Sequence, residues 1–218
     1  MHLSETEELP AEQKLAIAHC APAIRGRLAA FFGLDRRLGR IVANAGEPML
    51  AQMRLAWWRD QLAQPPEQRP GGDAVLDAIG VEWVDPAPLI ALVDAWEVLV
   101  THEELAPATI QDFAEGRALP LGHLDAGAGE ALRRRLQSAG RRWALADAAA
   151  HTSSNEERLQ IVAAGLAEDG AKNGLPRHVR GMMILEALAI RALRRGGYPL
   201  MEGRGAALVA LRVGLLGR

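Results

Sequence analysis

The stretch PMLAQMRLAWWRDQLA, residues 48–63, carries the clearest structural signal in the chain. Pro48 suits the first turn of a helix, and the two prolines after Gln64 suit its end. At about 100° per residue, the segment has two neighbouring hydrophobic stripes, formed by Leu50, Met53 and Trp57 and by Leu55, Trp58 and Leu62. Because hydrophobic side chains cover more than half of the cylinder, we expect this helix to lie at the centre of a bundle.

Helical signals of the same kind continue on both sides of this segment. Ala, Leu and Arg are frequent, and Pro and Gly recur at helix-length intervals. Gly116–Gly129, with four glycines and a proline, is expected to be a loop. Since no linker divides residues 1–218, we predict an all-α, single-domain, multi-helix bundle. The expected helices are Glu12–Cys20, Arg25–Ala43, Pro48–Ala63, Asp73–Ile79, Pro88–Val100, Pro107–Glu115, Glu130–Ala150, Asn155–Leu166, Pro176–Arg195 and Glu202–Leu216.

Composition narrows the class of protein. Hydrophobic residues make up 49% of the chain and charged residues 24%, which is typical of a globular protein. A formal charge of -2 provides no basic field for nucleic acid, so no nucleic-acid partner is expected. Cys20 stands alone, which excludes an intrachain disulfide. The segment from Met1 to Glu5 has no apolar run typical of a signal peptide, so we expect a cytoplasmic protein.

Two consecutive segments carry a resemblance to a known family. These are RLAAFFGLDRRLGRIV, residues 27–42, and EPMLAQMRLAWWRD, residues 47–60. Further similarity lies in GRRWALAD, residues 140–147, and in LPR, residues 175–177. The chain resembles the squalene/phytoene synthase superfamily, and within it the branch of bacterial phytoene synthase-like proteins and the mitochondrial complex I assembly factor. The resemblance implies an all-α fold of the isoprenoid-synthase type, here shortened.

Active members of that superfamily carry two aspartate-rich motifs on facing helices. Carboxylates one turn apart share a helix face, so each pair binds Mg²⁺ ions that hold a diphosphate leaving group. In the register of the resemblance, the first pair falls at Gly39 and Ala43, and the second at Asp147 and His151. We therefore expect no catalytic residue, no metal site and no cofactor. Arginines remain able to hold a diphosphate weakly without turning it over.

The family places its cavity between these helices, which predicts a remnant ligand-binding pocket. Arg54 and Gln61 project from within the hydrophobic arc of their helix, so their polar ends need partners or a cavity to line. The residues expected to line the pocket are Phe32, Asp35, Arg54, Trp58, Gln61 and Asp147.

Several of these residues, and their neighbours, have two interpretations. Asp73 and Asp77 have the spacing of a relocated metal site, but they also follow a Gly-Gly pair where aspartates cap a helix. Asp35 is either a remnant metal ligand or an exposed or paired aspartate. Trp57 and Trp58 form either an aromatic wall for a prenyl chain or part of the core.

Two arginine-rich stretches also have two interpretations. Each is either a solvated helix face or a surface for anionic lipid headgroups or an acidic partner. The stretches comprise Arg133, Arg134, Arg135, Arg141 and Arg142, and then Arg191, Arg194 and Arg195.

Two functions follow from these patterns. The first is a protein that has lost Mg²⁺-dependent prenyl transfer and binds an isoprenoid or other lipid, or acts with a protein partner in assembling a respiratory complex. Such a protein would be cytoplasmic and peripheral at the inner face of the membrane. The alternative is an active prenyl or terpenoid transferase, which would use Mg²⁺ held by displaced ligands such as Asp73 and Asp77.

Overall fold

The structure is a computed structural model that describes residues 9–101, 106–168 and 174–216. Within these ranges every regular element is a helix, which confirms the predicted all-α class. Two short 3₁₀ turns, Pro66–Gln68 and Arg177–Val179, supplement the α-helices. The α-helices are α1 Ala11–Ala18, α2 Pro22–Ala43, α3 Pro48–Ala63, α4 Ala74–Glu82, α5 Ala87–Thr101, α6 Pro107–Gly122, α7 Glu130–His151, α8 Asn155–Ala167, α9 Arg180–Arg194 and α10 Arg204–Leu216.

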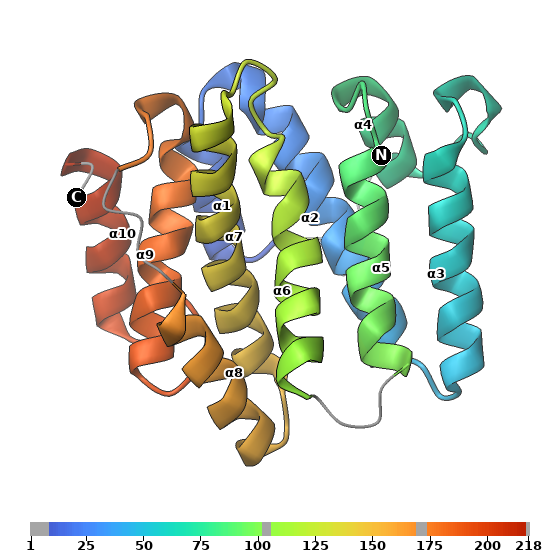
Figure 1. Ribbon diagram of the computed structural model, residues 1–218. Coiled ribbons are helices and arrows are strands. Elements are labelled where there is room, and N and C mark those ends of the chain that lie inside the picture. The colour runs from blue at the N-terminus through green and yellow to red at the C-terminus, as the bar shows by residue number, and fades with distance from the viewer. Residues whose placement is uncertain (1–8, 102–105, 169–173, 217–218) are drawn as a thin grey trace.

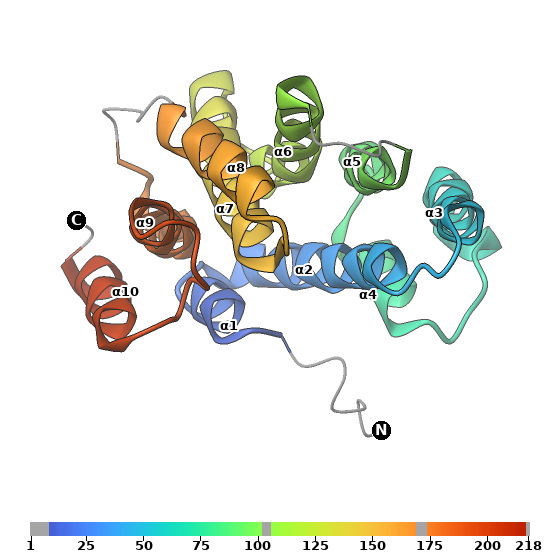
Figure 2. The same cartoon turned by 90° about the horizontal axis from the view of Figure 1, so that it is seen from below.

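Most of the helices stand side by side in a row. The row runs from α3 at one edge through α5, α6, α7 and α9 to α10 at the other (Figure 1). The long helix α2 crosses one side of this row and contacts α5 and α6 (Figure 2). Helices α1 and α4 also pack against it, and α4 runs alongside, with Glu82 beside Gly26 and Val75 beside Gly33. Helix α8 packs against α7 and α9. The layers meet where α2 faces α5, α6 and α7.

Local sequence explains where several helices begin. Pro22, Pro48 and Pro107 occupy the first turns of α2, α3 and α6, where a missing amide hydrogen removes no helical hydrogen bond. Asp73 caps α4, because its carboxylate accepts hydrogen bonds from the amides of Val75 and Leu76. These signals are local, so the sequence alone predicts them well.

The prediction of a loop over Gly116–Gly129 is wrong for its first half. Helix α6 continues to Gly122 and contains Pro120. Gly116 is needed for packing, because a Cβ atom there would lie 2.7 Å from the Cβ of Ala95 and 2.8 Å from the carbonyl oxygen of Ala91. Close contact with α5 therefore stabilises a helix across residues that usually interrupt one.

Helix α3 has the predicted bounds but lies at the edge of the bundle (Figure 1). One predicted stripe, Leu55, Trp58 and Leu62, is buried against the rest of the protein. The other stripe is exposed: Leu50 by 49%, Met53 by 63% and Trp57 by 41%. The expected central position of this helix is thus wrong, since hydrophobic residues around a helix do not establish what covers them.

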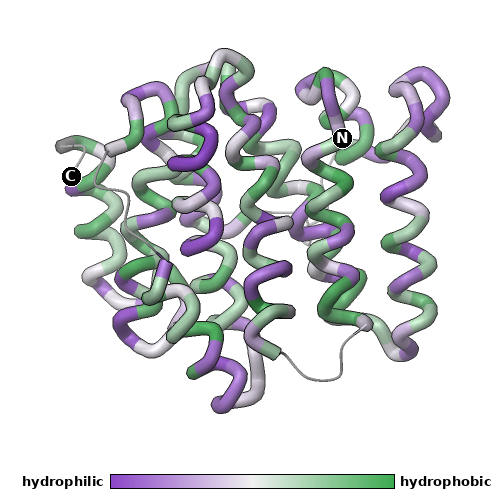
Figure 3. Tube along the Cα trace, in the orientation of Figure 1, coloured by the Kyte–Doolittle hydropathy of each residue, from purple (hydrophilic) through white to green (hydrophobic). Residues whose placement is uncertain are grey.

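Helix α5 has neighbours on several sides, although α7, which packs against α6, α8 and α9, is more enclosed. Helix α5 lies between α3 and α6 and also contacts α2. Hydrophobic residues follow most of its length (Figure 3). Leu89, Leu92 and Val93 are fully buried. Among the described helices, none is long and apolar enough to cross a membrane.

Candidate functional site

A cavity of about 710 Å³ opens between α1, α2, α5, α6, α7 and α8. Its volume is within the usual range for small-molecule sites, which is roughly 300–1,000 Å³. Hydrophobic side chains such as Leu99, Ile110 and Leu145 line much of it. The segment Pro199–Met201, before α10, completes the wall. The cavity therefore gathers residues from distant parts of the chain.

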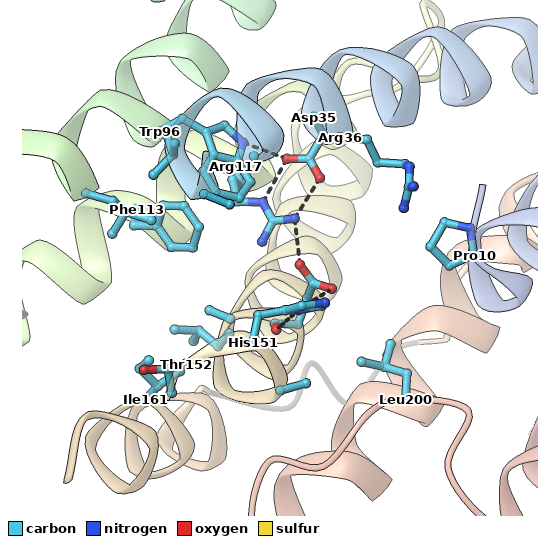
Figure 4. Close-up of a pocket in the computed structure, with 18 of the residues that line it drawn as sticks. Pro10, Asp35, Arg36, Trp96, Phe113, Arg117, His151, Thr152, Ile161 and Leu200 are labelled. Atoms are coloured by element: carbon cyan, nitrogen blue, oxygen red, sulfur yellow. Dashed lines mark hydrogen bonds and ion pairs between the residues drawn. The ribbon is translucent and has the colours of Figure 1, made fainter. Parts of the chain in front are cut away.

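Arg117 joins two aspartates in the wall of this cavity (Figure 4). Its Nε and Nη2 atoms donate hydrogen bonds to the two carboxylate oxygens of Asp35, at 2.9 and 2.6 Å. Nη2 also donates to Oδ2 of Asp147, at 2.9 Å. Because α2, α6 and α7 each supply one member, this triad ties three helices together.

Aromatic rings surround the guanidinium of Arg117. Its Cζ atom lies 4.5 Å from the ring centroid of Trp143, 4.9 Å from that of Trp96 and 5.2 Å from that of Phe113. Trp96 also donates a hydrogen bond of 2.9 Å from Nε1 to Oδ1 of Asp35. Ring faces attract cations, so the same groups that exclude water from Arg117 also stabilise its charge.

The electrostatics of the triad keep Arg117 charged. Burial by itself would lower the pKa of this side chain, but the nearby charges of Asp35 and Asp147 outweigh burial and raise the pKa further. Arg117 and Asp35 are each 2% exposed at the side chain. Arg117 is therefore a buried, permanently charged group, and the Asp147 end of the triad, 20% exposed, lies toward the cavity.

Gly39 and Ala43, the positions that correspond to the first metal-binding pair in the resemblance, both line the cavity. A Cβ atom on Gly39 would lie 2.9 Å from Cη2 of Trp96. A carboxylate at position 39 would therefore require Trp96 to move from its place beside Asp35 and Arg117. The residues present do not fit a Mg²⁺ pair at this wall, because the space is taken by an indole ring.

The structure brings together only part of the predicted pocket. Asp35 and Asp147 line one cavity, as expected, but Arg54 is exposed on α3. Phe32 lies behind the wall, where its ring packs 5.5 Å from that of Trp143. Trp58 and Gln61 are buried elsewhere in the bundle, away from the cavity lining. Because α3 lies at the edge of the bundle, its side chains Arg54, Trp58 and Gln61 do not reach the cavity.

Sequence reasoning missed the residues that define the cavity, namely Arg117, Trp96 and Phe113. Phe113 and Arg117 are one helical turn apart, a spacing that puts both on one face. This signal is useful only if the helix continues past Glu115, and the predicted loop concealed it. Trp57 and Trp58, considered for an aromatic wall, contact each other on α3 instead.

The alternative metal pair, Asp73 and Asp77, lies outside the cavity lining. Asp73 caps α4 and forms an ion pair of 3.1 Å with Arg37. Asp77 is exposed in the first turn of the same helix. Both positions match the capping interpretation. Within residues 9–101, 106–168 and 174–216, no three His, Cys, Asp or Glu side chains are placed to share a metal ion.

Most arginines of the first basic stretch are engaged inside the protein. Arg135 and Arg142 both bind the buried Glu186 on α9. Arg141 binds Glu168, with Nε 2.8 Å from Oε2, and also Glu115. These ion pairs connect α7 to its neighbours. Neither sequence interpretation, a solvated face or a lipid-binding face, describes them.

Glu12 on α1 lines the same cavity, and burial raises the pKa of its carboxyl group, with a further contribution from Asp147. A raised pKa means that the folded protein binds the proton more tightly than the unfolded chain does. The ionised form of Glu12 therefore lowers the stability of the folded state once the pH rises above its pKa.

We expect Glu12→Gln to raise the Tm at about pH 7 and to leave it unchanged at about pH 4, where Glu is largely protonated.

Thermal unfolding of both proteins across this pH range measures the effect. Glu47→Gln, at an exposed position before α3, is the matched control and should leave the Tm unchanged at both pH values. A lower Tm for Glu12→Gln at neutral pH would contradict the expectation.

No protein-family model, curated protein or solved structure matches the chain.

Proposed function

We propose that this chain is a squalene/phytoene synthase-like protein, with a shortened fold of the isoprenoid-synthase type, that has lost Mg²⁺-dependent prenyl transfer. It binds an isoprenoid or other lipid in the cavity between α2, α6 and α7. The observation that carries the proposal is Arg117, whose guanidinium sits between Asp35 and Asp147 in the cavity wall.

The chemistry of prenyl transfer explains why this arrangement matters. Ionising an allylic diphosphate requires positive charge beside the departing group, and metal ions held by carboxylates supply stabilisation of several kcal/mol. Here a single guanidinium is hydrogen-bonded to both facing carboxylates and occupies the space between them. Gly39 and Ala43 provide no further ligand at the neighbouring positions. Without that stabilisation, each 1.36 kcal/mol lost slows the reaction about tenfold.

The remaining lining supports binding of an apolar chain. Trp96 and Phe113 lie close together in the wall, and Ile161 and Leu200 line other parts of it (Figure 4). Ile110 is a further apolar lining residue. Burial of apolar ligand surface contributes roughly 25 cal/mol per Å², which is sufficient for a hydrocarbon chain without any strong polar anchor. A cavity of this kind suits an isoprenoid or an acyl chain.

The proposal includes an assembly or membrane-surface role for the exposed stripe of α3. Met49, Leu50, Met53 and Trp57 stay exposed on the outer side of this edge helix. Exposed hydrophobic patches commonly mark contacts with proteins or membranes. A location at the inner face of the cytoplasmic membrane and a part in assembling a respiratory complex are consistent with such a surface. The alternative transferase has less support, because Asp73 is engaged as a helix cap.

Two measurements on the purified protein test the proposal. Lipid extraction and native mass spectrometry should find an isoprenoid or other lipid bound at one copy per chain. Incubation with farnesyl or geranylgeranyl diphosphate, Mg²⁺ and reductant should yield no hydrocarbon product. Metal-dependent formation of squalene, phytoene or a cyclic terpene that Asp35→Ala or Asp73→Ala abolishes would overturn the loss of prenyl transfer.

A cavity-filling variant locates the bound lipid. Ala148 lines the cavity on α7, so Ala148→Phe should reduce lipid occupancy by at least about tenfold by occupying the space of the chain. Ala163→Phe, at an exposed position on α8, is the matched control and should retain the lipid. Equal occupancy in both variants would contradict binding in this cavity.

A further inference from the structure

Helix α10 forms the edge of the helix row opposite α3, and it leaves a stripe of leucines uncovered (Figure 1). Leu208, Leu211 and Leu215 are exposed by 67%, 59% and 68%. Their spacing of three and four residues places them on one face of the helix. The face that packs toward α9 carries smaller buried side chains, those of Ala206, Ala210 and Val213. The outward leucines are therefore available to another molecule.

The charged residues around this stripe are almost all arginines. The segment from Arg191 to Leu216 contains five arginines and one carboxylate, that of Glu202, in a chain whose formal charge is -2. Arg204 and Arg212 are exposed and stand four residues before and after Leu208. Residues four apart are neighbours on a helix surface, so positive charge lies directly beside the leucines.

These arginines differ from those of α7, which bind glutamates of neighbouring elements. Within the described part of the chain, Arg194, Arg204 and Arg212 form no ion pair. Arg195 donates a hydrogen bond of 3.1 Å to a backbone carbonyl, and its guanidinium lies 5.8 Å from the ring centroid of the exposed Tyr198. A surface of guanidinium groups without counterions attracts an anionic partner.

We infer that α10 binds the surface of a bilayer that contains anionic lipids, with Leu208, Leu211 and Leu215 at the acyl boundary and Arg204 and Arg212 among the phosphates. Leucines on one face with arginines beside them are typical of helices that lie in the membrane interface. A guanidinium binds phosphate through paired hydrogen bonds. The inference rests on the membrane location in the proposed function and names the surface responsible.

A second copy of the chain fits this surface less well. Two α10 helices in symmetric contact would bring Arg204 and Arg212 of one copy close to the same residues of the other, and like charges repel. An anionic bilayer supplies the opposite charge along the whole helix.

The exposed stripe of α3 lacks this surplus of positive charge. Its exposed charged neighbours are of both signs, namely Glu47, Arg54 and Asp60. Because α3 and α10 lie at opposite edges of the row, variants can alter one surface without the other (Figure 1).

Flotation of the purified protein with lipid vesicles tests the inference. One set of vesicles contains phosphatidylcholine alone, and the other contains phosphatidylcholine mixed with the anionic phosphatidylglycerol. We expect binding to the mixed vesicles to be about thirtyfold tighter, the factor for two arginines near an anionic surface, and to weaken as salt is added. Equal binding to both sets would overturn the preference for anionic lipids.

Two double variants locate the contact on α10. Arg204→Gln with Arg212→Gln should weaken binding to mixed vesicles about thirtyfold, to the level seen with neutral ones. Leu208→Gln with Leu211→Gln should weaken binding to both sets at least about tenfold, because less apolar surface is buried. Glutamine is a good helix former and these positions are exposed, so both variants should keep the wild-type unfolding curve.

Leu50→Gln with Met53→Gln is the matched control, since it removes exposed apolar side chains from α3 and should leave vesicle binding unchanged. Binding that the α10 variants retain and this control loses would overturn the role of α10, while the membrane location stands. If the wild type binds neither set, both the inference and the membrane location fail, and lipid in the cavity is still measured by native mass spectrometry. A dimer in sedimentation equilibrium that Leu208→Gln with Leu211→Gln dissociates would also overturn the inference, because a second copy would then cover the leucines.

Discussion

Replacing Arg117 with methionine is expected to lower the free energy of unfolding by about 3–5 kcal/mol, the usual effect of breaking a buried ion pair from one side. The stability falls because the variant leaves the buried carboxylate of Asp35 without its partner. Asp35 is buried and receives two of its hydrogen bonds from Arg117, so the variant would leave its charge without a counterion. Asp147, on α7, would lose the same partner. Denaturant unfolding of both proteins measures the change.

Two further variants distinguish this effect from a loss of packing. Arg134→Met removes an arginine whose ion pair with Glu130 is exposed on both sides, and it should cost less than about 1 kcal/mol. Adding Asp35→Asn and Asp147→Asn to Arg117→Met removes the unpaired charges and should recover most of the lost stability. A loss below about 1 kcal/mol for Arg117→Met would show that the triad does not hold α2, α6 and α7 together.

Gly181→Ala is expected to destabilise the protein by about 1–3 kcal/mol or more and to separate α1 from α9. A Cβ atom at Gly181 would lie 1.9 Å from the carbonyl oxygen of Ala16 and 2.8 Å from Sγ of Cys20. The first of these atoms belongs to the backbone, so α1 itself must move. In an exposed helix the same change would stabilise, since Ala has the higher helix propensity. At Gly181 the clash outweighs this gain, so we expect the change to lower the stability of the protein.

The effect should extend to the cavity, because α1 carries Glu12 and Gln13. Gly181→Ala is thus expected to lose bound lipid as well as thermal stability, and both can be measured on the same preparation. Gly46→Ala is the matched control: a Cβ atom there meets no atom within 4 Å. If Gly181→Ala retains wild-type stability and lipid content, the close contact between α1 and α9 is not required.

The helical architecture could be predicted because its signals are local. Prolines at the first turns of α2, α3 and α6 mark helix starts through their own backbone geometry. The exception is α6 beyond Glu115, where Gly116 and Pro120 indicated a loop. Packing against Ala91 and Ala95 on α5 overrides that local preference. Ala91 and Ala95 lie on another helix, so the residues next to Gly116 in the sequence give no sign of this contact.

The candidate site was less predictable than the fold. Asp35 and Asp147 were placed in one pocket by the register of the resemblance, and the structure places both in the cavity wall. Arg117 was absent from that prediction, although it is the residue that binds them. Its partners are 82 and 30 residues away in the chain, and such separations leave no periodic signal. Arg54, by contrast, was predicted from its helix face and is exposed.

By itself, the sequence determined that this protein is helical and where most helices begin and end, because proline geometry and hydrophobic periodicity act within a few residues. Only the tertiary structure decided that α3 lies at an edge with Leu50, Met53 and Trp57 exposed. It also decided that the guanidinium of Arg117 fills the space between Asp35 and Asp147. Which helix covers a stripe and which charge reaches a buried carboxylate depend on contacts between distant segments.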